Sequence, residues 1–451
     1  MLGPAVTIAR AARAATRRAG RGGTTAAGRV LLRLEPDAIA QLARRLGRGA
    51  VLVSATNGKT TTSTMLAAIL GRARVPLVHN RAGSNMHWGI ATALLDAGRH
   101  DHELGLFEVD EAWLPAVADA VQPQLMLLSN LFRDQLDRYG ELELLAERWA
   151  DTVARHASHT RFALNADDPL VADLGRTIDN AVYFGLEDDA QALPELQHAA
   201  DSKHCRNCGH PYVYEAVYLG HLGRYRCPNC GRRRPQPDVI ARKVDLHGMT
   251  GSSIQLETPA GNSAIELKLP GLYNVYNALA AATAAIELGA TLEQVRAGLE
   301  GFGGAFGRVE RIPVGGREVL ILLVKNPAGA NEVLRTLTLE PGRLDLWLAL
   351  NDRIADGRDV SWIWDADFEL LADRVATVTC SGTRAEEMAL RLKYAGIDAR
   401  PAIDRDLGAS LDAAVARGDR GRPLFALPTY TALLELRDEL ATRGMAGRWS
   451  D

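Results

Sequence analysis

This 451-residue sequence has no long apolar run, no histidine in its C-terminal part and no acidic residue at its N-terminus. No apolar run approaches the roughly 18 residues that a membrane-spanning helix needs. No histidine follows His247, so the C-terminal part cannot supply the commonest catalytic base. Cysteine is scarce, and four of the five residues pair at metal-binding spacing, so no disulfide framework is indicated. We therefore expect a cytoplasmic protein.

Acidic residues are absent from Met1 to Leu34, where seven arginines stand. The apolar stretch of a secretory signal does not follow these charges. Three interpretations stay open: a mitochondrial transit peptide, a basic helix packed on the body of the protein, and a segment that touches anionic lipid headgroups. The arginines are Arg10, Arg13, Arg17, Arg18, Arg21, Arg29 and Arg33.

Size and composition indicate a folded protein of two or three domains, at about 150 residues per domain. Hydrophobic residues make up 47% and charged residues 24%, which is the balance of a globular chain. The net charge of −3 argues against a nucleic-acid binder. We expect a basic N-terminal extension (1–48), a central domain (49–305) with an insert at about 198–236, and a smaller C-terminal α/β domain (306–451).

Apolar runs alternate with helical patterns after residue 49, which predicts an α/β domain with a mainly parallel sheet. A β-rich stretch (238–269), a helix (274–288) and a second α/β pattern from Val319 follow the insert. The predicted strands are 50–54, 104–109, 125–128 and 161–164, and the first predicted helix is 60–70.

A phosphate-binding loop is predicted between the first strand and the first helix. Backbone N–H groups of such a loop cradle phosphate oxygens. Lys59 is expected at the β- and γ-phosphates, and the Thr60 hydroxyl at Mg²⁺. Val53 stands where the general pattern has its first glycine, so the general pattern fails. The nucleotide-binding candidates are Thr56, Asn57, Gly58, Lys59, Thr60 and Thr61.

Carboxylates follow two later strands, where open α/β sheets bind their ligands. Glu108 ends the apolar run 104–109 and is a candidate Mg²⁺ ligand beside the phosphates. The segment 130–137 brings further polar groups to the same edge of the sheet. An acidic surface turn is the alternative interpretation of Glu108.

Two Cys-x-x-Cys-Gly knuckles lie in the insert, with 18 residues between Cys208 and Cys227. This spacing is typical of a four-cysteine zinc ribbon, and four thiolates leave no open coordination position. We predict one structural Zn²⁺, held by Cys205, Cys208, Cys227 and Cys230. We interpret Arg232, Arg233 and Arg234 as a solvated basic edge rather than a nucleic-acid surface.

These features together resemble the Mur ligase family, whose fold has a central ATP-binding domain of this kind. The match covers the loop 55–60, with Ala55 in place of a glycine, and the magnesium glutamate at Glu108. The family's asparagine-rich helix resembles the segment with Asn274 and Asn277, and its hinge resembles 307–310 with Arg308. The resemblance implies that these residues bind ATP and Mg²⁺.

Within the family, the ribbon and the segments 325–329 and 351–362 resemble an amidating branch. That branch implies ATP-dependent amidation of the α-carboxyl of D-glutamate in the lipid II stem peptide, through an acyl phosphate. It also implies ammonia from a GatD-like glutaminase subunit, lipid II at the inner membrane face, and no nucleic acid. Asp352, with Asp356 as second choice, resembles an aspartate that the ligase lends to its partner's Cys-His pair.

The chain itself offers no glutaminase pair, because such a site needs a cysteine nucleophile with a histidine base. Cys380 is the one cysteine outside the knuckles, and it lies in the part without histidine. We interpret it as a buried residue at the end of a strand. Two competing hypotheses remain: an amino-acid-adding ligase like folylpolyglutamate synthase or a murein-precursor ligase, and a non-catalytic zinc-ribbon scaffold.

Overall fold

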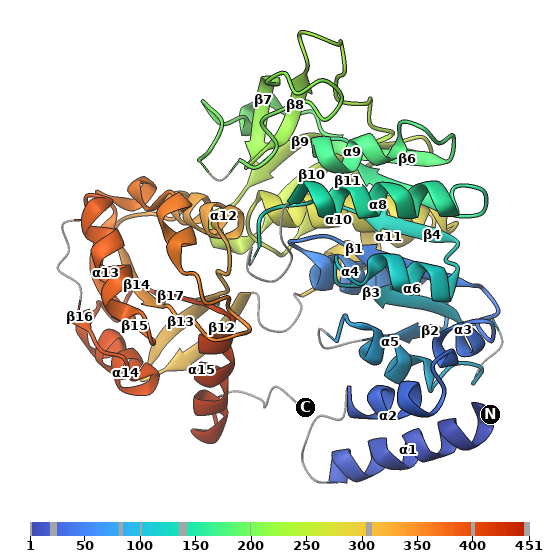
Figure 1. The fold of residues 1–451 in the computed structure, drawn as a ribbon. Helices are drawn as coiled ribbons and strands as arrows, with labels where there is room; N and C mark the ends of the chain where they lie inside the picture. The colour runs from blue at the N-terminus through green and yellow to red at the C-terminus, as the bar shows by residue number, and fades with distance from the viewer. Residues whose placement is uncertain are drawn as a thin grey trace.

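The computed structural model describes residues 2–18, 25–80, 84–99, 102–134, 142–198, 200–303, 309–397 and 402–445. It contains a large central sheet, a smaller C-terminal sheet and a separate hairpin (Figure 1). This arrangement confirms the expected α/β class with a parallel sheet. Among the described residues, no helix is both long and apolar enough to cross a membrane.

The central sheet has nine strands and is parallel from β9 to β2, whereas β10 runs antiparallel to both β9 and β11. Strand β1 lies between β3 and β4, so the chain order reverses on either side of it and the loop after β1 opens at the switch point. In spatial order the strands are β11 (Gly261–Leu267), β10 (Ser252–Thr258), β9 (Val239–Leu246), β6 (Ala181–Leu186), β5 (Arg161–Asn165), β4 (Leu125–Leu128), β1 (Ala50–Ser54), β3 (Leu104–Glu108) and β2 (Leu77–His79).

Helices cover both faces of this sheet, and an apolar core fills each side. One face carries α4 (Lys59–Arg72), α10 (Leu272–Glu287) and α11 (Leu292–Glu300). The other carries α2 (Ala26–Leu34), α3 (Ala38–Ala43), α5 (His87–Leu94), α6 (Leu114–Val121), α8 (Leu142–His156) and α9 (Pro169–Ala172).

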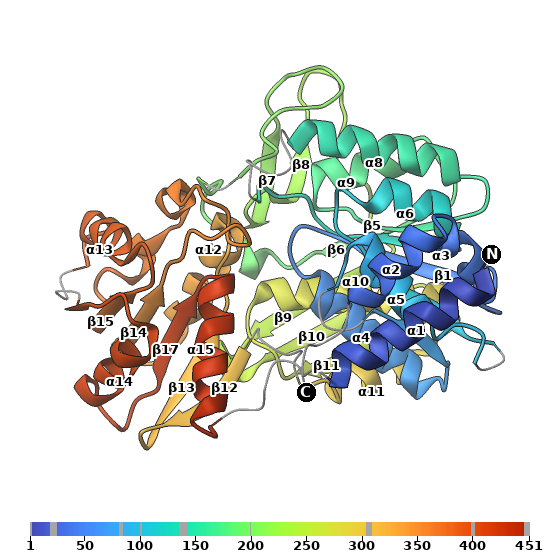
Figure 2. The same ribbon diagram turned by 60° about the horizontal axis from the view of Figure 1, so that its bottom comes forward.

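The basic N-terminal segment forms α1 (Leu2–Arg18), which packs across α2 on the outside of this second layer (Figures 1 and 2). Arg10 donates to the Leu95 carbonyl oxygen at 2.6 Å, and Arg13 pairs with Asp96 at 3.0 Å. A basic helix packed on the body is therefore what the structure contains. The side chains of Arg17 and Arg18, and all of Arg21, lie outside the described residues.

The insert folds as the hairpin β7 (Val213–Leu219) and β8 (Leu222–Arg226) beside the two knuckles. Our interpretation of a solvated basic edge is wrong for two of its three arginines. The Arg234 side chain is 6% exposed and pairs with Asp167 at 2.5 Å and Glu187 at 2.6 Å, and the half-buried Arg232 pairs with Asp173 at 2.7 Å. These ion pairs fix the insert to the central domain.

The C-terminal sheet is parallel except for its edge hairpin β12–β13, which begins ten residues before the expected start at Val319. Its spatial order is β12 (Val309–Val314), β13 (Arg317–Leu322), β17 (Leu424–Pro428), β14 (Leu344–Ala349), β15 (Val375–Ser381) and β16 (Ala402–Ile403). The helices are α12 (Pro327–Thr338) and α13 (Ala385–Tyr394) on one face, and α14 (Leu407–Arg417) and α15 (Tyr430–Thr442) on the other.

Helix α12 joins the two domains. Arg335 donates to the carbonyl oxygens of Tyr218 at 2.7 Å and Gln191 at 2.8 Å in the central domain. One turn away, Glu332 is 1% exposed, and neither of its carboxyl oxygens has a hydrogen-bond partner among the described residues. Burial raises the pKa of Glu332 to about 7, although Arg335 opposes the shift.

Replacing Glu332 by glutamine should therefore stabilise the protein at pH 8. The folded-state pKa lies above that of an exposed glutamate, so the ionised carboxylate destabilises the fold above about pH 7, and this cost fades as the pH falls toward 4.5. We expect a gain on the order of 2–3 kcal/mol at pH 8 that shrinks toward pH 5, measured by urea unfolding. The exposed control Glu293→Gln should change little, and a less stable Glu332→Gln protein at pH 8 would contradict the assignment.

Candidate active site

The predicted phosphate loop leaves β1 and enters α4, at the carboxyl edge of the central sheet. Gly58 has φ +89°, a backbone conformation that residues with a side chain rarely adopt. A Cβ atom at Gly58 would lie 2.0 Å from Oδ1 of Asn277 on α10. Glycine is therefore required here both by the turn and by the helix packed behind it.

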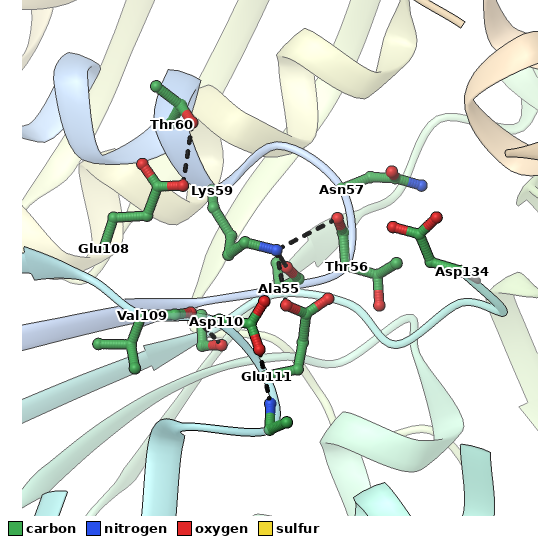
Figure 3. Close-up of polar contacts among 12 residues, drawn as sticks. Ala55, Thr56, Asn57, Lys59, Thr60, Glu108, Val109, Asp110, Glu111 and Asp134 are labelled. Atoms are coloured by element: carbon green, nitrogen blue, oxygen red, sulfur yellow. Dashed lines mark hydrogen bonds and ion pairs between the residues drawn. The ribbon is translucent and has the colours of Figure 1, made fainter. Parts of the chain in front are cut away.

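Lys59 begins α4 with its ammonium group inside the loop (Figure 3). It donates to the Ala55 carbonyl oxygen at 2.5 Å and to Glu111 Oε2 at 2.7 Å. Burial is the largest single influence and lowers the pKa of Lys59, but the charge and hydrogen bond of Glu111, together with the charges of Asp110 and Glu108, outweigh it, and the net pKa is raised. Lys59 is thus a fixed, fully protonated cation at the start of a helix, where phosphate oxygens bind.

Thr60 and Glu108 meet beside Lys59, as Figure 3 shows, with Oγ1 of Thr60 donating to Oε1 of Glu108 at 3.0 Å. Neighbouring ligands of Mg²⁺, each about 2.1 Å from the ion, lie about 3 Å apart. A hydroxyl and a carboxylate are also the donors that this hard cation prefers. The pair therefore fits the predicted magnesium site.

Asn80, the residue directly after β2, holds the backbone of Glu108 in place. Its side chain accepts from the Glu108 N–H at 2.9 Å and donates to the Glu108 carbonyl oxygen at 2.8 Å. This two-point contact holds the backbone of Glu108, so the carboxylate stays directed at Thr60.

Asparagine side chains from two separate segments of the central domain pack against the loop and the start of α4. Asn130, after β4, accepts from the Asn57 N–H at 2.9 Å and donates to its carbonyl oxygen at 3.0 Å. Asn277 accepts from the Thr62 hydroxyl at 3.1 Å and donates to Asn274, also at 3.1 Å. Asn277 thus packs beside Gly58 and supports the first turn of α4, and Asn274 holds Asn277 in place.

The C-terminal domain reaches the same loop. Asn326, which caps α12, donates to the Asn57 side-chain oxygen at 3.0 Å. Lys325 donates to the Thr56 carbonyl oxygen at 3.3 Å and forms an ion pair with Asp134. The two domains therefore enclose the phosphate loop between them. Thr61 is buried at the base of α4, and Arg308 and the segment 135–141 lie outside the described residues.

Asp352 and Asp356 follow β14 and differ in environment. Asp356 is buried and accepts from the Thr431 N–H at 2.8 Å and the Thr431 hydroxyl at 2.5 Å, so it caps the start of α15. The Asp352 side chain is 26% exposed and accepts from Thr383 and Arg384, each at 2.8 Å. These hydrogen bonds, with that of Thr383 the largest cause, lower the pKa of Asp352, whereas burial raises the pKa of Asp356.

Cys380 lies near the end of β15 and is fully buried. Burial raises the pKa of its thiol to about 12, so it carries no thiolate at neutral pH. This environment agrees with the interpretation of Cys380 as a core residue.

The four knuckle cysteines converge, with all sulfur atoms within 4.8 Å of one another. Cys205 and Cys230 Sγ lie 3.6 Å apart, and Cys208 and Cys227 Sγ lie 3.5 Å apart. Four sulfurs about 2.3 Å from a tetrahedral zinc ion lie about 3.8 Å apart, so this geometry fits Zn²⁺.

Sequence reasoning missed the contacts that Glu111, Asn130 and Asn326 make with the loop and its lysine, and the contact of Asn80 with Glu108. Glu111 stands in the acidic run after β3, and Asn326 stands in a segment singled out by resemblance. For Glu111 and for Asn326, the available signal is a polar residue just after a predicted strand. Nothing in the sequence pattern shows that the segments of these two residues meet at the loop.

A nine-stranded sheet with this loop, a magnesium-type Thr-Glu pair and a second α/β domain over it defines the Mur ligase class. The Mur ligase middle domain model matches residues 53–230, and the MurT ligase C-terminal model matches 323–433. The chain is 34% identical to the lipid II isoglutaminyl synthase (glutamine-hydrolyzing) subunit MurT of Staphylococcus aureus strain N315, over 97% of each chain. It is 33% identical to the MurT subunit of Streptococcus pneumoniae R6, over 93% of each. The chain belongs to the MurT family.

Solved structures support the fold alone. A pseudomurein peptide ligase type C from Methanothermus fervidus superposes with a TM-score of 0.67 at 23% identity, over 88% of this chain and 79% of the other. The MurF ligase of Thermotoga maritima in complex with ADP gives a TM-score of 0.62 at 15% identity, over 90% and 84%.

Lys59→Ala should abolish ATP-dependent turnover while the fold stays intact. Loss of a charge-assisted phosphate contact costs about 1.5–3 kcal/mol in binding, and more where charge develops in a transition state. Nucleotide affinity by calorimetry and turnover by phosphate release measure the two effects. The matched control is Lys243→Ala, an exposed lysine on β9, and wild-type turnover in Lys59→Ala would remove Lys59 from the site.

One zinc ion per chain should be found by elemental analysis. Cys227→Ser should lose the metal and lower stability or soluble yield, because metal binding supplies the folding free energy of such small modules. Cys380→Ser, a buried cysteine outside the ribbon, should keep the zinc. A folded, zinc-free Cys227→Ser protein that binds ATP yet cannot turn over would contradict the structural role.

Proposed function

We propose that this chain is the ligase subunit of a glutamine-dependent enzyme that amidates the α-carboxyl of D-glutamate in the lipid II stem peptide. The observation that carries the proposal is the loop with Lys59 and the Thr60–Glu108 pair, enclosed by the domain that bears Asp352. Similarity to MurT subunits over nearly the whole chain supports the amidation in particular.

The reaction consists of two substitutions. A carboxylate oxygen of the substrate attacks the γ-phosphorus of ATP, ADP leaves, and an acyl phosphate forms. Ammonia then attacks the acyl carbon, inorganic phosphate leaves, and the nitrogen loses a proton to give the primary amide. Magnesium, when bound, neutralises charge on the phosphate oxygens.

This chain's residues orient the nucleotide for the first substitution. Lys59 offers a fixed positive charge to the phosphates, and Thr60 with Glu108 would hold the magnesium ion. Lys325 and Asn326 keep the C-terminal domain against the loop, which restricts water at the reacting group. Glu111 keeps Lys59 in place until phosphate oxygens compete for it.

A GatD-like glutaminase supplies the ammonia in this proposal, because the described part of the chain contains no cysteine–histidine pair fit for the task. Asp352 is the residue we propose to orient the partner's histidine. Its side chain is 26% exposed and its lowered pKa keeps it ionised, whereas Asp356 is buried and burial raises its pKa. Lipid II would be reached at the inner face of the membrane.

Asp352→Asn should cripple amidation driven by glutamine and spare amidation driven by ammonium. An amide side chain cannot stabilise a partner's imidazolium, and the same aspartate-to-asparagine change in a serine protease triad lowers kcat by about 10⁴. The assay follows the amidated stem peptide by mass spectrometry with each nitrogen source, in the complex with the glutaminase.

Two controls separate the outcomes. Lys59→Ala should fail with either nitrogen source, and Asp356→Asn should lower thermal stability, because it removes an α15 cap. Equal loss of both activities in a stable Asp352→Asn protein would place Asp352 in the ligase site. Loss of neither, with a stable Asp356→Asn protein losing only the glutamine reaction, would move the role to Asp356.

A further inference from the structure

We propose that the N-terminal helical layer, α1 to α3 (residues 2–18 and 25–48), binds the anionic surface of a phospholipid membrane. Contact would be peripheral, through phosphate-bearing headgroups. The inference deepens the proposed function and rests on it for its purpose, since the proposed substrate is linked to a lipid.

Charge is segregated along this sequence. Residues 1–48 contain ten arginines, no lysine and two acids, Glu35 and Asp37, for a net charge of +8. The whole chain has 52 basic and 55 acidic residues, so the remaining residues have 42 and 53, for a net charge of −11. A basic segment on an otherwise acidic protein directs it toward a polyanionic surface and keeps the acidic body away from that surface.

Among the described residues, no other element packs on the outer face of helix α1. Its inner face, with Ala5, Val6 and Ala9, is buried against the protein. Pro4, Ile8, Ala11 and Ala15, which follow a helical spacing, are exposed on the outside, and Ile8 is 52% exposed. Figures 1 and 2 both place this helix outermost in its layer, away from the C-terminal domain.

Within the part of this layer that the structure describes, few carboxylates neutralise the arginines. Arg13 pairs with Asp96, but Arg10 donates to a carbonyl oxygen and Arg29 stacks 4.8 Å over the Trp88 ring, and neither partner is an anion. Arg33 and Arg44, on α2 and after α3, are exposed.

Anchoring by Arg10 and Arg13 fixes the direction in which the apolar face points. The helix therefore does not have to fold on binding, which saves the ordering entropy that a disordered basic tail would lose. The small outer side chains permit only a shallow apolar contact, so we expect electrostatic attraction to dominate, with about fivefold in partition coefficient per arginine.

Co-sedimentation with vesicles tests the proposal, using the 451-residue chain with its glutaminase partner. Binding should appear on vesicles of phosphatidylglycerol and phosphatidylcholine in equal amounts, be weak on phosphatidylcholine alone, and fall as salt rises. Arg33→Glu with Arg44→Glu should lower the partition coefficient at least about 25-fold. The charge-matched control is Arg417→Glu with Arg420→Glu, two exposed arginines of the C-terminal domain, which should bind like the wild type.

A second pair of variants, one test and one control, examines the apolar outer face of α1. Ile8→Glu should weaken vesicle binding, whereas Leu144→Glu, at 50% exposure on α8, should not. Circular dichroism shows whether each variant is folded. Equal binding to both vesicle types, or no difference between the test and control pairs, overturns the proposal.

Binding of either of two other partners at this surface would also overturn the proposal. Self-association that Ile8→Glu abolishes, seen by sedimentation velocity without lipid, would make the face an interface between copies. Binding of single-stranded RNA that competes fully with vesicles would make it a nucleic-acid surface.

Amidation of a lipid-free stem peptide should be unchanged in all four variants, the two N-terminal ones and their two controls. Vesicle binding without any amidation would count against the proposed function alone.

Discussion

The rest of the site depends on one constraint: the phosphate loop must keep a single shape although its backbone carries strongly polar groups. Asn130 satisfies the backbone of Asn57, and Asn277 both occupies the space beside Gly58 and accepts from Thr62. Amide side chains suit this task because each can donate and accept without adding charge. A charged side chain in their place would compete with Lys59 or repel phosphate.

The local part of this site could be predicted from the sequence, and the long-range part could not. A strand, a short Gly-Lys-Thr loop and a helix place Lys59 and Thr60 by themselves, and the carboxylate at the end of the predicted strand 104–109 places Glu108. By contrast, Asn326 meets Asn57 from 269 residues away. Packing also decides which acid of the run 108–111 pairs with Lys59. Buried Trp149 donates to the Glu111 carbonyl oxygen and so fixes the backbone of the residue whose carboxylate contacts Lys59.

The ribbon illustrates the same division. Cysteine spacing predicts the knuckles, because both ends of each lie within four residues. The arginines that follow look solvated in the sequence, because their partners Asp167, Asp173 and Glu187 stand far back along the chain. Only the folded sheet brings those acids beside Arg232 and Arg234. Burying such a cation is tolerable when carboxylates compensate it, and the result is an insert tied firmly to the central domain.

The C-terminal sheet connects the two halves of the proposed chemistry through one edge. Strands β13 and β14 are both parallel to β17, so their carboxyl ends lie at the same side. After β13, Asn326 caps α12 and holds Asn57, and after β14 comes Asp352, supported by Thr383 from the end of β15. A glutaminase bound at Asp352 would therefore contact the edge that also encloses the phosphate loop. If Asp352 completes the partner's triad as proposed, that contact lies on the same sheet edge as Asn326, which holds the phosphate loop, so this sheet connects ammonia release to carboxylate activation.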